Sequence, residues 1–205
     1  MVKVKICGIR SLLDARLSVE LGADFIGLNF WPGSKRVISS EEAGKIVKEL
    51  KGKVKLVGVF VNQDLNEVKE IVERYQLDYI QLHGEEDFRY CQKFSKPVIK
   101  ALGLSSEKAL KIMDKYQEVI WLIDSKTQGY GGSGVKPDWE LAKKAKQKAG
   151  RIILAGGLNP ENVKEAVQKV GPWVVDVASG VESAVGVKDP ERLKKFFKAV
   201  RDVSE

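Results

Sequence analysis

Residues 1–30, with the sequence MVKVKICGIRSLLDARLSVELGADFIGLNF, contain one strand, one helix and a second strand in succession. Apolar and polar residues alternate in the first run, Val2–Ile6, which is the period of a strand. Residues 12–21 then carry apolar side chains at helical spacing, and a second strand-like run follows at Asp24–Phe30. Because a helix separates the two runs, the pattern predicts that the two strands are parallel.

The same alternation continues along the rest of the chain without a linker. Eight strand–helix units at a spacing of about 25 residues are what a (β/α)8 TIM barrel needs, with its active site at the C-terminal ends of the strands. We therefore expect residues 1–205 to form a single barrel domain. A doubly wound open sheet is the alternative, but Cys7-Gly8-Ile9-Arg10 after the first run is not the glycine-rich turn of that fold. The predicted strands are Val2–Ile6, Asp24–Phe30, Val54–Val61, Tyr79–Leu82, Pro97–Leu102, Val119–Ile123, Arg151–Leu154 and Trp173–Val177.

The composition excludes several classes of protein. With 43% hydrophobic and 31% charged residues, the chain is neither disordered nor dependent on disulfides for a core. Its two cysteines form no C-x-x-C motif, which favours a reducing compartment, and no apolar stretch is long enough to span a membrane. The net charge of +7 comes from lysines interspersed with glutamates, a pattern typical of solvated helix faces. We expect a cytoplasmic protein that binds neither nucleic acid nor membrane.

Sorting each predicted strand by alternate residues suggests which face points inward. We expect one face to be apolar and to pack under the helices, and this set includes Val57, Val59 and Val61. The opposite face carries polar groups, among them Lys5, Lys100 and Asp176. Because ionisable groups are costly to bury unpaired, their position near strand ends suggests an active site at the mouth of the barrel. The expected inward set is Lys3, Lys5, Cys7, Gly27, Asn29, Gln81, His83, Lys100, Asp124, Val174 and Asp176.

Two of these residues could carry acid and base chemistry. Cys7 ends the first strand above Lys5, whose charge would favour a thiolate, although a lone cysteine is more commonly a small buried hydrophobe. Asp124 ends the sixth strand, where partial burial could tune it as a general acid, although it could instead cap a turn. The glycine-rich residues 128–134 that follow suggest a lid that closes over substrate.

Further segments suggest a site for an anionic ligand. Glycines after the seventh and eighth strands, in residues 154–160 and 178–182, would let backbone N–H groups approach a phosphate, unless these segments are simply turns. Arg36 could hold a carboxylate through two hydrogen bonds, or could be solvated. His83 is the chain's only histidine, and without partner ligands it favours a hydrogen-bonding role over a metal site. No metal is expected.

With these residues in order, the chain resembles the phosphoribosylanthranilate isomerase family of tryptophan biosynthesis. Each motif alone is weak, but together they span nearly the whole chain. Ala178 is a departure, since the family often has a serine at that position of the final motif. The motifs are Lys5-Ile6-Cys7-Gly8, Gly22-Ala23-Asp24, Ser34-Lys35-Arg36, Gly58-Val59-Phe60-Val61-Asn62, Gln81-Leu82-His83-Gly84, Asp124 with Gly131-Gly132-Ser133-Gly134, Ala155-Gly156-Gly157-Leu158, and Asp176-Val177-Ala178-Ser179-Gly180-Val181-Glu182.

The resemblance implies an Amadori rearrangement of a phosphorylated small molecule without a cofactor. The sequence leaves the oligomeric state open between a monomer and a homodimer. It implies that Asp124 is the general acid that opens the ribose ring and that Cys7 is the general base that removes the C2′ proton. Arg36 would hold the anthranilate carboxylate, and Asp176 would lie near the anthranilate amine. The full set of substrate-binding residues that it implies is Arg36, Gln81, His83, Gly132, Gly156, Gly157, Asp176, Ser179 and Gly180.

Three other functions are the alternatives. An indole-3-glycerol-phosphate synthase would require catalytic lysine and glutamate residues at several strand ends. A pentose-phosphate epimerase would need a metal-binding His/Asp set, which a single histidine excludes. A non-catalytic phosphate-binding barrel would have lost the acid or the base, whereas Cys7 and Asp124 are both present.

Overall fold

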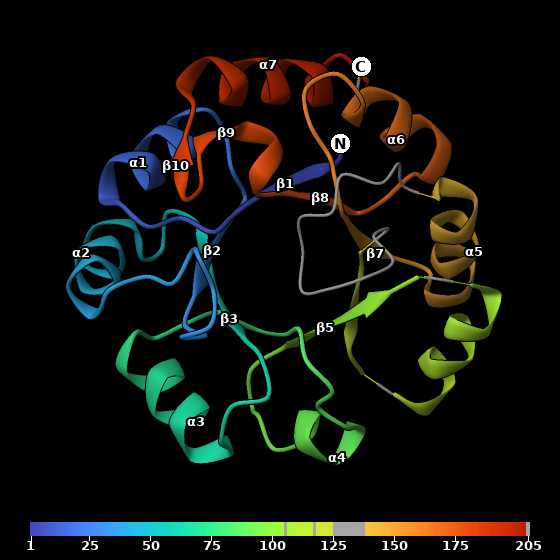
Figure 1. The fold of residues 1–205 in the computed structure, drawn as a ribbon, viewed down its shortest axis with the longest axis horizontal. Coiled ribbons are helices and arrows are strands. Elements are labelled where there is room, and N and C mark those ends of the chain that lie inside the picture. Colours follow the sequence, from blue (N-terminus) through green and yellow to red (C-terminus); the bar gives the residue numbers. More distant parts are fainter. Residues whose placement is uncertain (105, 117, 125–137, 204–205) are drawn as a thin grey trace.

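The computed structural model describes residues 1–104, 106–116, 118–124 and 138–203. Its strands β1 to β8 form a closed barrel in which each strand pairs with the next along the chain and β8 pairs with β1. Every pairing is parallel. Figure 1 looks down the barrel, with the strands in the centre and the helices around them. The predicted (β/α)8 barrel is confirmed, and the open-sheet alternative is excluded.

Helices follow the strands in regular alternation, with three departures. A 3₁₀ helix, η1, stands after β5, a second 3₁₀ helix, η2, follows β8, and a short antiparallel hairpin precedes α7. In the described part of the chain, no helix is both long and apolar enough to cross a membrane. The elements are β1 (Lys3–Cys7), α1 (Leu12–Glu20), β2 (Phe25–Asn29), α2 (Ser40–Leu50), β3 (Lys55–Phe60), α3 (Leu65–Arg74), β4 (Tyr79–Leu82), α4 (Phe88–Cys91), β5 (Val98–Gly103), η1 (Glu107–Lys115), β6 (Ile120–Asp124), α5 (Trp139–Ala149), β7 (Ile152–Ala155), α6 (Val163–Val170), β8 (Val174–Val177), η2 (Ser179–Val181), β9 (Glu182–Ala184), β10 (Val187–Lys188) and α7 (Pro190–Arg201).

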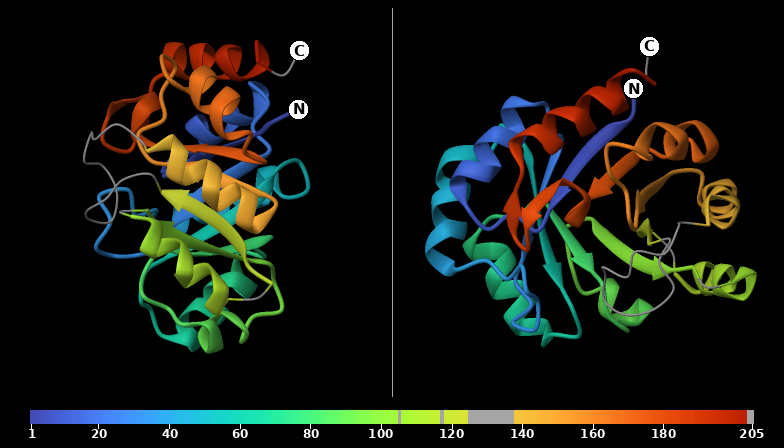
Figure 2. Two further views of the ribbon diagram at one scale, coloured as in Figure 1. Left: turned by 90° about the vertical axis from the view of Figure 1, so that its right-hand side faces the viewer. Right: turned by 45° about the horizontal axis from the view of Figure 1, so that its top comes forward.

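The last helix illustrates how local sequence sets the element boundaries. The Asp189 carboxylate accepts hydrogen bonds from the backbone N–H groups of Glu191 and Arg192, and Pro190 takes the first turn, where no N–H donor is needed. The buried stripe of α7 consists of Leu193, Phe196, Phe197 and Val200. Figure 2 shows that α7 lies along β1, so that the two chain termini are on the same side of the barrel.

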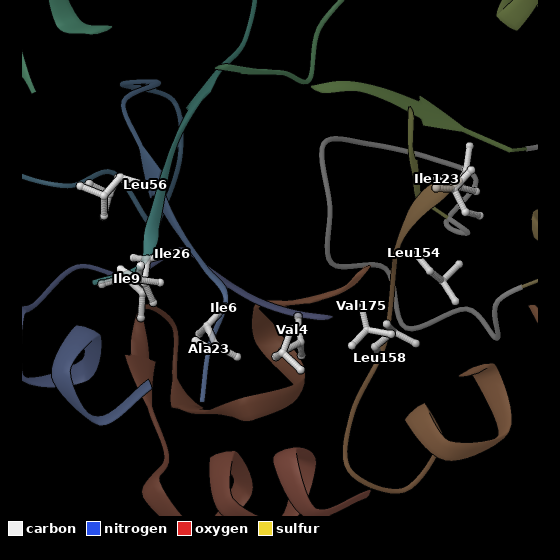
Figure 3. Packing of buried hydrophobic residues seen from close by; sticks show 14 of the residues in the cluster. Val4, Ile6, Ile9, Ala23, Ile26, Leu56, Ile123, Leu154, Leu158 and Val175 are labelled. Atoms are coloured by element: carbon white, nitrogen blue, oxygen red, sulfur yellow. The ribbon is translucent and has the colours of Figure 1, made fainter. Parts of the chain in front are cut away.

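The main hydrophobic core lies between the strands and the surrounding helices. Figure 3 shows part of it, where Val4 and Ile6 of β1, Ile26 of β2 and Val175 of β8 point away from the barrel axis. Each of these side chains is at most 4% exposed, and burying one such side chain contributes about 1.5–3 kcal/mol to folding. This layer fixes the curvature of the sheet and so the positions of the strand ends.

A second, separate cluster of buried side chains fills the inside of the barrel. It consists of Phe25, Val57, Ile99, Leu122, Ile153, Ala155 and Val174. At the N-terminal end, the Phe25 ring makes edge-to-face contacts with Tyr79 and Trp173, at centroid distances of 5.5 and 5.8 Å. Aromatic packing therefore closes the bottom of the barrel, and any internal cavity must open at the opposite end.

The prediction for the third strand was wrong in its choice of faces. Val57 belongs to the interior cluster and Val59 lies at the barrel mouth, whereas Leu56 and Phe60 of the same strand pack under the helices. Val61, also expected under the helices, lines the mouth as well. Both faces of β3 are apolar, so hydrophobicity alone could not distinguish inside from outside.

Lys100 was also assigned to the wrong face. It alternates along β5 with Ile99, which points into the barrel, and so lies on the helix-facing side. There its ammonium group donates to the carboxylate of Glu86 at 2.8 Å and to the carbonyl of Gly84. The Glu86 carboxylate in turn accepts from the backbone N–H groups of Asn62 and Gly84. The pair holds the loop after β4 and is buried because each charge has its partner.

Candidate active site

A cavity of about 460 Å³ opens at the C-terminal ends of the strands. The residues that line it come from β1, β2, β3, β4, β6, β7 and β8 and from the loops that follow them, as the barrel fold predicts for an active site. Nine of the predicted site residues line this one cavity: Cys7, Arg36, Gln81, His83, Asp124, Gly156, Gly157, Asp176 and Ser179.

Cys7 stands at the end of β1 directly above a buried ion pair. The Lys5 ammonium lies 3.0 Å from both carboxylate oxygens of Asp176, its register partner on β8. Burial raises the pKa of the Cys7 thiol, and although the Lys5 charge opposes this, the Asp176 carboxylate adds to it. The predicted effect of Lys5 is therefore present, but burial outweighs it and the thiol is the favoured form at neutral pH.

The same contacts keep Lys5 charged. Burial by itself would lower the pKa of the Lys5 ammonium, but the Asp176 carboxylate and the Cys7 sulfur raise it, and the net pKa lies above the ordinary value. A cation is thus fixed below the sulfur, where it can stabilise a thiolate once one forms.

Gly27 on β2 provides the space for this arrangement. It is the register partner of Cys7, and a Cβ atom at this position would lie 2.8 Å from the Cys7 Sγ and 3.1 Å from the Lys5 Nζ. A side chain here would have to displace the thiol. The sequence placed Gly27 on the inward face but gave no reason for a glycine.

Asp124 ends β6 and lies near His83, which follows β4, the next strand but one in the barrel. Its Oδ2 atom lies 3.9 Å from the Nε2 atom of His83. The other ring nitrogen, Nδ1, is 3.1 Å from the Nε2 atom of Gln81, which lies two residues earlier, in β4. The three side chains therefore form one row, and the structure brings the predicted acid together with the chain's only histidine.

Arg36 is held in place by a carboxylate that the sequence analysis did not single out. Its Nε and Nη2 atoms donate to the two Glu182 oxygens at 2.8 and 2.7 Å, a two-pronged contact that fixes the plane of the guanidinium group. Burial would raise the pKa of Glu182, but Arg36 and Lys188 outweigh it and lower the pKa, so Glu182 is ionised. Arg36 is thus presented to the cavity in a fixed orientation.

Lys188 of the β9–β10 hairpin forms hydrogen bonds to three parts of the site: the end of β1, the loop after β8 and the Glu182 carboxylate. Its buried Nζ donates to the carbonyl oxygens of Cys7 and Ala178 at 2.7 and 3.0 Å and to the Glu182 carboxylate at 3.0 Å. Burial lowers the pKa of Lys188, with Glu182 opposing. Three acceptors require three N–H hydrogens, which only the ammonium form provides, so we assign the charged form.

The loops after β7 and β8 form the far wall of the cavity. Gly156 and Gly157 have positive φ angles of 90° and 67°, conformations that favour glycine and turn the chain sharply after the strand. The Asn162 side chain holds this turn by donating to the Gly157 carbonyl at 2.9 Å. Ser179 lines the cavity from the next loop.

Two predicted binding residues are placed differently from the rest. Gly180 is not among the residues that line the cavity; a Cβ atom there would clash with the carbonyl oxygen of Leu158, so its small size lets the two loops pack together. Gly132, and the glycine-rich segment 128–134 predicted as a lid, lie outside the described residues.

Glu182 and Lys188 are the functional residues that sequence reasoning missed. Glu182 belongs to the motif after β8, yet nothing in the sequence indicated that it would reach Arg36, which is far away along the chain. The residues around Lys188 are typical of a surface segment. Lys188 is nevertheless buried, because the hairpin folds back over the site, and the local sequence does not predict this. Within the described residues, no three His, Cys, Asp or Glu side chains are grouped to hold a metal ion. That the protein needs no metal stays a prediction.

Comparison with known proteins gives consistent results along the whole chain. The family model described as N-(5'phosphoribosyl)anthranilate (PRA) isomerase matches residues 4–199. The N-(5'-phosphoribosyl)anthranilate isomerase of Thermotoga maritima is 46% identical over 97% of this chain and 98% of its own.

Solved structures give the same result. The crystal structure of phosphoribosyl anthranilate isomerase from Thermotoga maritima is similar with a TM-score of 0.93, covering 98% of this chain and 100% of that one at 46% identity. A crystal structure of phosphoribosyl anthranilate isomerase in complex with reduced 1-(o-carboxyphenylamino)-1-deoxyribulose 5-phosphate is similar with a TM-score of 0.89, at 43% identity and with 98% and 100% coverage.

Proposed function

The chain belongs to the N-(5'-phosphoribosyl)anthranilate isomerase family, and from this premise we propose how the residues of its barrel mouth carry out the family's reaction. The protein is an isomerase of tryptophan biosynthesis. It converts N-(5-phosphoribosyl)anthranilate to 1-(2-carboxyphenylamino)-1-deoxyribulose 5-phosphate, an Amadori rearrangement of an aldose to a ketose.

One observation carries the assignment of roles. Cys7 at the end of β1 and Asp124 at the end of β6 line the same cavity, from well-separated strands of the barrel. A sugar bound in the cavity would lie between a carboxyl group and a thiol. The reaction needs one group that donates a proton to the ribose ring oxygen and one that removes a proton from C2′, the carbon next to C1′, and these two side chains are suited to those tasks.

The first step opens the ring. Asp124 in its protonated form donates its proton to the ribose ring oxygen, and the bond between that oxygen and C1′ breaks. The nitrogen lone pair of the anthranilate amine forms a double bond to C1′, which gives a protonated Schiff base. The carboxylate that remains on Asp124 faces the His83 ring, whose Nε2 atom is 3.9 Å away.

The second step moves the double bond. The Cys7 thiolate removes the proton from C2′, and the electron pair of that C–H bond forms a C1′–C2′ double bond while the Schiff-base nitrogen regains its lone pair. The resulting enolamine takes a proton at C1′ and loses the proton of its C2′ hydroxyl group, which gives the ketone. A raised thiol pKa makes the thiolate scarcer but a stronger base, and the buried Lys5 ammonium stabilises it.

The remaining residues hold the two anionic ends of the substrate. Arg36, fixed by Glu182, would bind the anthranilate carboxylate, for which its Nη1 atom is the nitrogen not used by the Glu182 pair. Asp176 would lie near the anthranilate amine, and Gln81 and His83 would line the ring-opening end. Backbone N–H groups of the glycine loops would bind the phosphate. The phosphate-binding set in this proposal is Gly156, Gly157, Ser179 and Gly180, and Gly132 is a further substrate-binding residue.

Several properties of the whole protein belong to the same proposal. The reaction as written needs neither a cofactor nor a metal, and its substrate is a small phosphorylated molecule. We place the protein in the cytoplasm, as one domain over residues 1–205, without nucleic-acid or membrane partners. It acts as a monomer or a homodimer; one similar solved structure is described as a monomer derived from a dimeric phosphoribosylanthranilate isomerase.

Loss of the substrate's fluorescence, with substrate generated in situ, provides the test. Wild-type protein should turn over, whereas Cys7→Ser and Asp124→Asn should each lower kcat by about 10²–10⁴-fold. Cys91→Ala is the matched control, since Cys91 is the other cysteine and lies in the outer core away from the cavity. Full activity of either site variant would contradict its assigned role, and failure of the wild type to rescue an auxotroph lacking this isomerase would contradict the activity itself.

A further inference from the structure

The side chains of Gln81 and His83 are in hydrogen-bond contact, and the proposed roles of Asp124 and Cys7 do not explain this contact. Gln81 of β4 and His83, the residue directly after β4, both line the cavity, and the Gln81 side-chain nitrogen lies 3.1 Å from the His83 Nδ1 atom. Gln81 is 1% exposed, so its amide group has little access to water. The contact therefore decides the state of the imidazole ring.

The direction of this hydrogen bond follows from the chemistry of the two groups. An amide nitrogen can only donate, so the Nδ1 atom that it faces must accept and carries no hydrogen. A neutral ring then has its hydrogen on Nε2. Turning the amide around would leave its NH₂ group where Oε1 now lies, a buried position with no hydrogen-bond partner among the described residues. Orphaned buried donors are rarer than under-satisfied carbonyl oxygens, which favours the orientation in the structure.

The opposite side of the ring faces the proposed acid. The His83 Nε2 atom is the ring atom 3.9 Å from the Asp124 Oδ2 atom, and catalytic hydrogen bonds commonly shorten when substrate binds. We propose that Gln81 is a positioning residue that holds His83 as its Nε2–H tautomer, so that His83 donates a hydrogen bond to the Asp124 carboxylate formed when the ring opens. This rests on the proposed role of Asp124 as the acid.

The arrangement also defines what His83 does not do. To pass a proton to Asp124 from Nε2, a neutral imidazole would have to take up another at Nδ1, where the Gln81 amide hydrogen already points. His83 is therefore a fixed donor and not a proton relay. Its hydrogen bond stabilises the negative charge that develops on Asp124, which is the form of assistance that a preorganised donor gives most effectively.

The direct test uses the fact that His83 is the chain's only histidine. In a ¹⁵N-labelled wild-type sample, two-bond ¹H–¹⁵N correlation spectra show one imidazole, and its two nitrogen shifts report the tautomer. We expect an unprotonated Nδ1 and a protonated Nε2 near pH 8. A protonated Nδ1 with an unprotonated Nε2, or an even mixture of the two, would overturn the proposal. Because this measurement needs no turnover, it tests the tautomer of His83 independently of the proposed activity.

Two variants test whether Gln81 acts through the histidine. Gln81→Met keeps the side-chain length but removes the donor, and should shift the tautomer toward protonated Nδ1 and lower kcat by about 10-fold or more. His83→Gln places an amide donor near the Nε2 position and should retain part of the activity. In the His83→Gln background, Gln81→Met should lower kcat by less than about 2-fold, because residues that act as one unit are non-additive. Equal losses in both backgrounds would show an independent structural role and would contradict the proposal.

Discussion

The ammonium group of Lys5 lies 3.0 Å from each carboxylate oxygen of Asp176, inside the barrel and directly below the Cys7 thiol. Lys5 is fully buried and Asp176 is 7% exposed, so each charge is stabilised mainly by the other and not by water. A pair of this kind adds little net stability, but removing one member leaves the other charge uncompensated. The pair also sets the electrostatic field in which the proposed base titrates.

Asp176→Asn should therefore destabilise the fold more than its loss of one charge suggests. We expect the free energy of unfolding in urea to fall by about 3 kcal/mol, because the Lys5 ammonium loses its counter-charge. Glu165→Gln is the matched control, since its ion pair with Lys169 is more than half exposed, and it should change stability by less than about 0.5 kcal/mol. Equal effects of the two changes on the free energy of unfolding would show that breaking the buried pair costs no more than breaking the exposed one.

The pH dependence of thiol alkylation should distinguish the two cysteines. Burial raises the pKa of Cys7 above its ordinary value of 9.0, so its thiolate fraction and its rate with iodoacetamide should rise about tenfold per pH unit up to at least pH 9. Cys91 should remain unmodified over the same range, because its side chain is buried in the outer core, away from the cavity, and burial also raises its pKa to about 11. Mass spectrometry of the peptides measures both rates. A Cys7 rate that levels off below pH 8 would contradict the direction of the shift.

Gly27→Ala tests the space beside the thiol. The new Cβ atom would lie 2.8 Å from the Cys7 Sγ, so the sulfur must move and kcat should fall by about 10²-fold, the cost of misplacing a reacting group by about 1 Å. Overpacking should lower the free energy of unfolding by about 1–3 kcal/mol. Gly44→Ala on α2 is the matched control: nothing lies within 4 Å of its Cβ position, and helix propensity predicts a gain of about 1 kcal/mol with unchanged activity.

Lys188→Met tests the link between the hairpin and the carboxylate clamp. Without the ammonium group, the Glu182 carboxylate loses one of its two cationic partners and keeps Arg36, and the carbonyls of Cys7 and Ala178 each lose a donor. We expect unfolding free energy to fall by about 3 kcal/mol and KM to rise by about tenfold as Arg36 loses its fixed orientation. Lys194→Met, at an exposed lysine of α7, should leave both quantities nearly unchanged. An unchanged KM in Lys188→Met would show that the hairpin does not contribute to substrate binding.

The regular spacing of strands and helices was enough to predict the barrel. The bounds of β4 agree with the prediction, and those of the other strands differ by no more than one residue at either end. Polar residues at alternating positions correctly identified the inward faces of β1 and β4. On β3 the same rule failed at Val57 because both faces are apolar, and on β5 it failed at Lys100 because a buried ion pair stabilises a charge on the outer face.

The individual site residues could be named from the sequence, but the contacts that orient them could not. Motif order and strand ends placed Cys7, Asp124 and Arg36 at one mouth. The bonds from Arg36 to Glu182 and from Lys188 to the Cys7 carbonyl join residues far apart along the chain. Local sequence carries no signal for such pairs, because they depend on how the hairpin after β8 returns over the end of β1.

The most direct measurement of the proposed mechanism is the isotope effect on the residual activity of two variants. With substrate deuterated at C2′, Cys7→Ala should show a clear primary isotope effect on kcat, because removal of that proton becomes the slow step without the base. Asp124→Asn should show an effect near unity, because ring opening is then the slow step and breaks no bond to deuterium. An isotope effect in Asp124→Asn as large as in Cys7→Ala, or the reverse pattern, would contradict the division of roles between the acid and the base.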